Sequence, residues 1–333
     1  MDPLTQGVLG ASLSLSVSKK QHLVVAGVFG LLAGMAPDLD VFIRSDRDPL
    51  LFLEFHRQFT HSLFFIPLGS FICALVLHRL IGKSQELSFK QSWFYSALGY
   101  STHALLDSCT SYGTQLFWPL TNERYAWNRV SVIDPLFTLP ILILLIVTLL
   151  KRNIRFARMA FLWALIYPTL GMVQRERAEA AGWQLAKTRQ HVPIQLEVKP
   201  SFANILVWKV IYETEGRYYV DAVRVGSSVK QYPGVSMEKL DVSRDFPWLD
   251  MNSQQAKDIE RFSQFSKGFL AKEPEEELRI IDVRYSIVPN QIDALWSINL
   301  SPSATVDAHV EYATHRDNSS ESRHTFFEML LDF

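Results

Sequence analysis

The chain has 333 residues, 48% of them hydrophobic and 20% charged, and its formal net charge is −1. This length is sufficient for two domains, and the mean hydropathy of +0.06 is high for an ordinary soluble enzyme. The balanced charge, with no basic stripe or interleaved aromatic platform, argues against a nucleic-acid partner.

The apolar residues are concentrated in the first half of the chain. Up to about Gln174 the sequence is a series of long apolar blocks, whereas from Arg175 onward charged and apolar residues alternate. Such alternation is typical of a water-soluble domain. The sequence therefore predicts a membrane-embedded helical domain over residues 1–174, followed by a soluble domain over residues 175–333.

Six apolar segments in the first part are candidate membrane helices, so we expect about six crossings. Two of them, Ser62–Ile81 and Pro135–Leu150, approach the roughly 20 apolar residues that cross a bilayer. The others are shorter or are interrupted by small and polar residues, which burial inside a helix bundle would explain. They are Leu4–Ser18, His22–Pro37, Ser92–Asp107 and Phe156–Val173.

Lysine and arginine residues between these segments predict the orientation, because short loops rich in them favour the cytoplasm. The turns after the first, third and fifth segments carry most of them: Lys19, Lys20, Arg79, Lys83, Lys90, Lys151, Arg152 and Arg155. With six crossings, these three turns are expected in the cytoplasm. Both termini, and with them the soluble domain, are then expected outside it.

The soluble part reads as a mixture of strands and helix. From about His191, short β-rich runs with partial alternation and a turn around Gly216 predict a largely antiparallel sheet. The stretch from Met251 to Phe269 predicts a helix that covers one face of it. We therefore expect an α+β domain that covers an active site or binds a protein partner. Its irregularly spaced histidines are interpreted as surface residues: His309, His315 and His324.

Ionisable residues also gather at the ends of the apolar segments, on the side that is predicted to be outside. This agreement is independent of the topology, which rests only on lysine and arginine. We expect these side chains to converge in one layer at the outer membrane face: Asp38, Asp40, His56, His61, His103, Asp107 and Asp134.

The residue types in this layer suit a divalent metal such as zinc, because neutral imidazole and carboxylate are common ligands of such ions. His103 and Asp107 are four residues apart in a helical pattern, so both project from one face of the helix. His56 and His61 are five apart, which fits a loop histidine followed by one in the first turn of a helix, with Thr60 as its N-cap.

Asp38 and Asp40 directly follow Pro37, where a helix end can turn both carboxylates inward. With them the layer offers six ligands, more than one tetrahedral zinc ion requires. We therefore expect one or two ions. A two-metal centre would lower the pKa of a bridging water and hold both oxygens of a phosphoester displacement.

Two further residues are candidates for catalysis, and each has an alternative. Arg57 would clamp a phosphate with its planar guanidinium, or it is an interfacial anchor; Arg124 and Arg129 are second candidates for the clamp. Asp134 precedes a proline, so it either belongs to the catalytic layer or caps the following helix.

Several stretches in about the first 140 residues resemble a known family: MDPLTQGVLGA, APDLD, HRQFTHSL, GYSTHALLDSCTSYGTQLFWPL and VIDPLF. They resemble the YdjM-like family of inner-membrane metal-dependent hydrolases, also described as LexA-binding inner-membrane proteins. The resemblance implies a bacterial inner-membrane hydrolase whose metal ligands are Asp38, Asp40, His56, His61, His103 and Asp107.

One residue departs from the family's pattern. Members commonly read MDPxTH near the start, whereas this chain has Gln6 at the position of the histidine. An amide is a poor replacement for imidazole as a ligand. The resemblance then implies either weak coordination through the amide oxygen or a metal position that is altered or lost.

The position of the expected site narrows its substrate. A metal-bound hydroxide at the outer membrane edge would meet membrane lipids, lipid-linked phosphates or envelope polymers, so we expect hydrolysis of a phosphoester or lipid-linked substrate. The alternative is a non-enzymatic, metal-stabilised envelope scaffold that presents its outer domain to a partner. Open coordination positions would favour the enzyme, and a saturated, inaccessible site would favour the scaffold.

Overall fold

The computed structural model describes residues 1–315 and 319–331, and the chain forms two compact units. The first unit holds Met1–Phe42, Phe55–Val173 and Phe202–Ile205, and the second holds Ile43–Glu54, Gln174–Ser201 and Leu206–Phe333. Apart from the two exchanged segments, Ile43–Glu54 and Phe202–Ile205, the units divide the chain between Val173 and Gln174. The sequence pattern contains no sign of either exchange.

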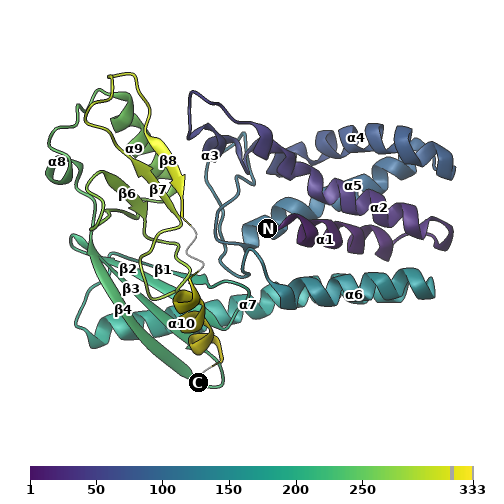
Figure 1. Cartoon of the computed structure of the whole chain (residues 1–333). Helices are drawn as coiled ribbons and strands as arrows, with labels where there is room; N and C mark the ends of the chain where they lie inside the picture. Colours follow the sequence, from purple (N-terminus) through teal and green to yellow (C-terminus); the bar gives the residue numbers. More distant parts are fainter. Residues whose placement is uncertain (316–318, 332–333) are drawn as a thin grey trace. The chain divides into compact units, whose positions relative to one another are not determined.

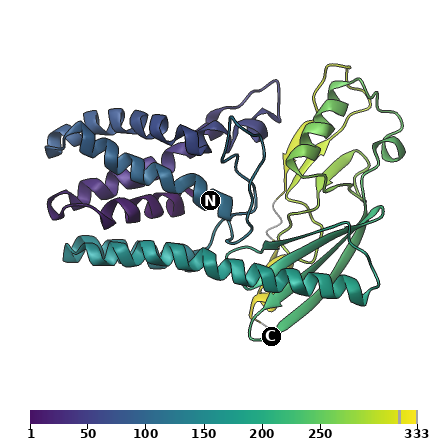
Figure 2. The same cartoon turned by 180° about the vertical axis from the view of Figure 1, so that it is seen from behind.

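The first unit is built from helices. It contains α1 (Pro3–Ser16), α2 (Leu23–Met35), α4 (Ile66–Leu77), α5 (Phe89–Cys109), α6 (Pro135–Lys151) and the beginning of α7 (Ile154–Thr188). The first four pack side by side, and α6 lies along α1 (Figure 1; Figure 2). Ser88 and Gln91 form a capping box at the start of α5, the helix that carries His103 and Asp107.

Glycines allow α1, α2 and α5 to approach backbone to backbone. A Cβ atom on Gly10 would lie 2.4 Å from the carbonyl oxygen of Gly30, and one on Gly99 would lie 2.3 Å from the same oxygen. Small residues at such crossings are typical of helices packed in a membrane. This contact fixes the end of α2 beside the last turns of α5, where His103 and Asp107 project.

Three helical segments are long and apolar enough to cross a membrane: Lys20–Phe42, Leu63–Gln85 and Ile154–Thr188. Exposed side chains such as Leu68 (54%) and Leu165 (55%) are consistent with surfaces that face lipid. The segment Pro135–Leu150 forms an apolar helix of only 17 residues. Within the described residues, about six crossings are therefore not confirmed.

The second unit contains two four-stranded antiparallel sheets. Their orders are β1 (Gln195–Pro200), β2 (Val207–Thr214), β3 (Arg217–Val225), β4 (Val229–Glu238), and β5 (Leu270–Lys272), β6 (Arg279–Asp282), β7 (Trp296–Asn299), β8 (Glu311–Thr314). The turn between β2 and β3 contains Gly216 at φ +73°, as the sequence predicts. The antiparallel α+β character is confirmed, with two sheets in place of one.

Helices accompany both sheets. The second half of α7 continues to Thr188 and packs on the first sheet through Leu185 and Ala186, which contact Tyr212. The helix α9 (Gln254–Phe265) packs Ile259 and Phe262 against Leu270 and neighbouring strand residues. The second unit also contains the short helix α8 (Val242–Asp245) and, after the last strand, the helix α10 (Ser320–Leu331). The covering helix expected between Met251 and Phe269 is thus present in a shorter form.

Candidate metal centre

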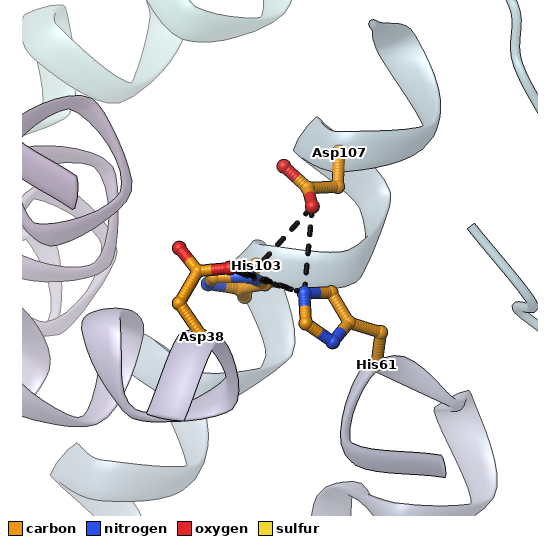
Figure 3. Close-up of side chains that lie close together, drawn as sticks. All are labelled: Asp38, His61, His103 and Asp107. Atoms are coloured by element: carbon orange, nitrogen blue, oxygen red, sulfur yellow. Dashed lines mark hydrogen bonds and ion pairs between the residues drawn. The ribbon is translucent and has the colours of Figure 1, made fainter. Parts of the chain in front are cut away.

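Four side chains of the first unit meet at one point, with one ligand atom of each within 4.8 Å of the others (Figure 3). Asp38 comes from the 3₁₀ segment η2 (Ala36–Phe42), and His61 comes from the 3₁₀ turn η3 (Phe59–His61). His103 and Asp107 come from one face of α5, as their spacing predicts. His61, His103 and Asp107 are fully buried, whereas the side chain of Asp38 is 20% exposed.

The distances between these atoms resemble those between the ligands of one small cation. Asp38 Oδ1 lies 3.3 Å from His103 Nε2 and 3.4 Å from His61 Nε2, and Asp107 Oδ2 lies 3.4 Å from His61 Nε2. Zinc bonds of about 2.0–2.1 Å in a tetrahedron place the ligand atoms roughly 3.3–3.4 Å apart. Two other distances differ from this value: 2.8 Å between the two Nε2 atoms and 3.9 Å between His103 Nε2 and Asp107 Oδ2. The donor types and the three distances above match one zinc-sized ion.

Hydrogen bonds to the outer ring nitrogens fix the tautomers of both histidines. His103 Nδ1 lies 2.6 Å from the carbonyl oxygen of Gly34, which can only accept, so this nitrogen carries the proton. His61 Nδ1 lies 3.2 Å from Asp40 Oδ2, which indicates the same tautomer. Both Nε2 lone pairs therefore face inward, 2.8 Å apart. Such a contact between two lone pairs is repulsive unless a proton or a metal ion lies between them. Hydrogen bonds of this kind to the outer ring nitrogens are typical of histidine ligands.

The carboxylate of Asp107 also has one oxygen in hydrogen bonds and one directed to the centre of the group. Its Oδ1 accepts a hydrogen bond from Gln6 Nε2 at 2.7 Å and contacts the amino group of Met1. Its Oδ2 is buried, forms an ion pair with Arg57 Nε at 3.0 Å but no hydrogen bond, and faces the histidines. Because a buried carboxylate oxygen without a hydrogen bond is incompletely compensated, this atom is suited to a metal. Gln6 donates from its amide nitrogen to this carboxylate, while its amide oxygen Oε1 is buried without a hydrogen-bond partner. Coordination through that oxygen stays a prediction.

The charges around His61 favour a cation. His61 precedes the span Leu63–Gln85. Burial by itself lowers the pKa of this imidazole, but hydrogen bonds to Asp107, Asp38 and Asp40 outweigh burial and raise the pKa to about 10. A proton or a metal ion is therefore strongly held at this position.

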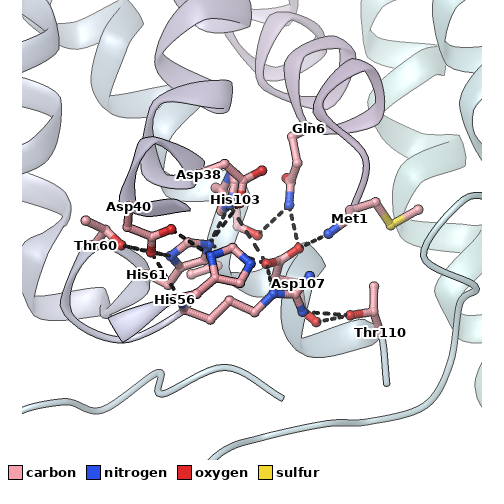
Figure 4. Close-up of polar contacts among 12 residues, drawn as sticks. Met1, Gln6, Asp38, Asp40, His56, Thr60, His61, His103, Asp107 and Thr110 are labelled. Carbon is pink, nitrogen blue, oxygen red and sulfur yellow. Dashed lines mark hydrogen bonds and ion pairs between the residues drawn. The ribbon is translucent and has the colours of Figure 1, made fainter. Parts of the chain in front are cut away.

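Asp40 and His56 lie next to the four central residues, on the side of His61 (Figure 4). Asp40 Oδ1 bonds His56 Nδ1 at 2.7 Å, and Asp40 Oδ2 accepts from Thr60 Oγ1 at 2.6 Å as well as contacting His61 Nδ1. Asp40 thus orients a ligand, and His56 in turn contacts Asp40. Neither belongs to the group of four, and direct metal ligation by either residue stays a prediction.

Arg57 lies directly beside the centre. Its Nε is 3.0 Å from Asp107 Oδ2, its Nη1 donates to Thr110 Oγ1 at 3.1 Å, and its guanidinium lies over the ring of Tyr112. The residue is only 4% exposed and has a left-handed φ of +65°, an uncommon conformation for a residue other than glycine. The structure therefore holds a positive charge next to a ligand carboxylate.

The other catalytic candidate, Asp134, is the N-cap of α6. Its carboxylate accepts from the backbone N–H groups of Leu136 and Phe137 at 3.1 and 3.3 Å, and from Tyr167 Oη at 2.8 Å. These contacts agree with the capping alternative, and a catalytic role stays a prediction. Of the alternative clamps, Arg124 donates to the carbonyl of His56 at 3.2 Å, and Arg129 lies over Trp127.

Sequence reasoning misplaced one residue here and missed two others. Thr60 is not an N-cap, because its hydroxyl bonds Asp40, while Ser62 caps the following turn by accepting from Phe64 N at 3.1 Å. The carbonyl of Gly34 and the hydroxyl of Thr110 were not expected at the site. Residue type does not indicate which backbone carbonyl points to a site. Thr110 follows Asp107 by three positions, so helical spacing could have predicted that it lies near the same site.

Comparisons with known proteins concern this helical part of the chain. The sequence model described as YdjM inner membrane protein matches residues 1–178, which include every residue of the centre. The inner membrane protein YbcI of Escherichia coli (strain K12) is 28% identical over 107 residues, or 31% of this chain. The chain spans 60% of the length of that relative. No solved structure matches.

Proposed function

The chain belongs to the YdjM inner membrane protein family, and from this premise we propose that it is a membrane-bound, metal-dependent hydrolase of phosphoesters or lipid-linked phosphates. The observation that carries the proposal is the pair of imidazole Nε2 atoms that face each other at 2.8 Å beside two carboxylates. Histidine with aspartate, in the absence of cysteine from the group of four, suits zinc in a reactive rather than a purely structural setting.

A bound divalent ion would supply Lewis acidity and a water of lowered pKa. His61, His103, Asp107 and Asp38 would hold that ion. Asp38 is the only one of the four with an exposed side chain, so we expect water and substrate to approach from its side. The buried guanidinium of Arg57 would attract the negative charge of a phosphoester.

The pair of His56 and Asp40 would handle a proton. The side chain of His56 is 30% exposed, and its Nδ1 bonds Asp40 Oδ1, so its Nε2 is left to exchange a proton with a substrate oxygen. A histidine oriented by a carboxylate is a common general acid and base. This role differs from direct ligation, and it agrees with the position of His56 behind His61.

We further propose a multi-pass protein of the inner membrane, with the metal centre and the second unit on the extracytoplasmic side. The turns of the first unit that are rich in lysine and arginine, such as Lys19 and Lys20 between α1 and α2, join helix ends opposite to those that carry the centre. Cysteines introduced near Lys20 and Ser111 would test this: labelling of the Ser111 position from outside the cell supports the proposal, and labelling of the Lys20 position contradicts it.

The decisive experiment is metal analysis of the detergent-purified protein. We expect one zinc ion per chain in the wild type and loss of at least tenfold in affinity in His103→Ala and Asp38→Ala. His324→Ala is the matched control, because that imidazole is 74% exposed on α10. The same samples are then assayed with a nitrophenyl phosphodiester and a short-chain phospholipid. Turnover that disappears together with the metal supports the enzyme.

A second function is favoured by one observation. Four protein ligands complete a tetrahedron, as in structural zinc sites. The centre would then tie together η2, η3 and α5 in a scaffold that presents the second unit to a protein partner. Stoichiometric zinc without turnover, combined with unfolding of the first unit on chelation, would favour the scaffold over the hydrolase.

A further inference from the structure

The residues of the metal centre come from two parts of the chain that are separated by a segment of the second unit. Asp38 and Asp40 precede the segment Ile43–Glu54, and His56, Arg57 and His61 follow it. This inserted segment, Ile43–Glu54, belongs to the second unit. The residues on its two sides are therefore joined by a stretch of chain whose packing partners come from elsewhere.

The inserted segment is part of the hydrophobic core of the second unit. Leu50 and Leu53 are 1% and 9% exposed and pack in one cluster with residues of α9 and of the second sheet. Phe52 makes an edge-to-face contact with Tyr312 of β8, with 5.2 Å between the ring centroids. Burial of these apolar side chains fixes the segment to the second unit.

The guanidinium of Arg261 binds two carboxylates of the inserted segment, those of Asp48 and Glu54. Arg261 of α9 donates from Nη1 and Nη2 to the two carboxylate oxygens of Asp48 at 3.0 and 2.8 Å, and from Nε to Glu54 at 2.6 Å. Its Nη1 also donates to Asp258 on its own helix at 2.9 Å. A planar, bidentate guanidinium fixes direction as well as distance, which a lysine would not.

In the first unit, Asp40 connects the chain before the inserted segment with the chain after it. Its Oδ1 bonds His56 Nδ1 at 2.7 Å, and its Oδ2 accepts from the backbone N–H of Arg57 at 3.1 Å (Figure 4). Glu54 precedes His56 by only two residues, a stretch that reaches at most about 7 Å. A displacement of Glu54 is therefore transmitted to His56 and Arg57.

We infer that Arg261 is a positioning residue for the metal centre: by joining Asp48 and Glu54 it fixes the conformation of the inserted segment, whose end leads directly into His56 and Arg57. The inference rests on the proposed metal centre for its effect on metal affinity. Coupling of this kind is reciprocal, so metal binding also stabilises the inserted segment in its place in the second unit.

The test is Arg261→Gln in the full-length, detergent-purified protein, with zinc affinity measured by competition with a chromogenic chelator. We expect a loss of about tenfold in zinc affinity, the size typical for outer-layer residues of a metal site. Arg244→Gln is the matched control: this guanidinium pairs with Asp245 and Glu238, which lie outside the inserted segment. Its zinc affinity should equal that of the wild type.

A milder variant and a metal-independent measurement separate positioning from a general loss of folding. Asp48→Asn leaves the contact of Arg261 with Asp258 in place, and we expect it to weaken zinc binding without adding to the effect of Arg261→Gln. With chelator present, hydrogen exchange of the peptide Phe55–Ser62 should quicken in both variants.

Each outcome of these measurements is decisive. Unchanged exchange in that peptide together with unchanged zinc affinity overturns the inference while the proposed function stands. A wild type that binds no zinc overturns the proposed function; the exchange measurement then still decides whether Arg261 positions the segment.

Discussion

Both units bury charged side chains, but within the described residues only the first brings a group of histidines and aspartates together at one point. In the second unit, Arg284 donates to Asp282 from Nη2 at 2.6 Å and from Nε at 2.9 Å, and Lys209 donates to Ser286 Oγ at 2.7 Å. In the metal centre, Asp107 Oδ2 forms an ion pair with Arg57 Nε at 3.0 Å but no hydrogen bond, and two imidazole Nε2 atoms lie 2.8 Å apart. Single buried atoms without a hydrogen bond, such as Glu197 Oε2, also occur in the second unit. Convergence of several ligand-type atoms on one point therefore indicates a ligand site, whereas burial of charge alone does not.

The largest expected effect lies in the second unit. Asp282→Asn removes the charge that balances the buried Arg284, and breaking a buried ion pair in this way costs about 3–5 kcal/mol of the free energy of unfolding. Chemical denaturation followed by tryptophan fluorescence measures this loss. Zinc content at saturating metal should remain as in the wild type. If zinc were lost while stability was kept, the charges of the second unit would belong to a metal site and the comparison would fail.

The second largest effect is expected on zinc affinity, from a substitution of Asp40, which contacts His61. Asp40→Asn keeps the shape of the side chain but removes the negative charge that orients His61, so we expect zinc affinity to fall by about 10- to 100-fold. Chelator competition measures it, with Asp46→Asn, a carboxylate close in sequence, as the control. An affinity below detection would instead indicate that Asp40 is itself a ligand, as the sequence predicted.

The smallest effect is a pH dependence of stability from Lys209. Burial lowers the pKa of this ammonium to about 7, although Asp282 and Asp293 raise it. The folded state then binds fewer protons than the unfolded state between pH 7 and about pH 10, so stability rises with pH in this window. From pH 7 to 8 the gain is about 1 kcal/mol.

The matching control for that measurement is Lys209→Met, which retains the length of the side chain without its charge. Denaturation midpoints at both pH values should differ less in this variant than in the wild type. Equal pH dependence of the two proteins would show that Lys209 is not neutral in the folded state, and that its hydrogen bonds to Ser286 and the carbonyl of Gln291 compensate for burial.

Part of the metal centre could be predicted because it depends on local geometry. His103 and Asp107 are one helical turn apart, so any helix through them directs both to one side. Asp38 and Asp40 are only two residues apart, and the sequence cannot decide which one points to the centre. In the 3₁₀ segment η2, Asp38 lies within the group of four and Asp40 lies behind His61.

The division of the chain into two units was also only partly predictable from local sequence patterns. The change from apolar blocks to alternation near residue 175 is a property of composition, yet α7 passes through it as one helix from Ile154 to Thr188. Residues after Gln174 such as Glu176, Ala178 and Ala181 favour a helix. Leu185 and Ala186, near the end of the same helix, pack on Tyr212 of the first sheet. Expected strands and the single covering helix depended on short-range periodicity, and the structure contains both.

By itself, the sequence determined the apolar helices, the antiparallel strands, and the residue types that can bind a metal, because each of these is a property of neighbouring residues. Only the tertiary structure decided which aspartates and histidines converge at one point, that Gln6 donates to Asp107, and that Ile43–Glu54 packs in the second unit. The physical reason is that ligand geometry and core packing are set by contacts between residues far apart in the chain, whose directions no local pattern records.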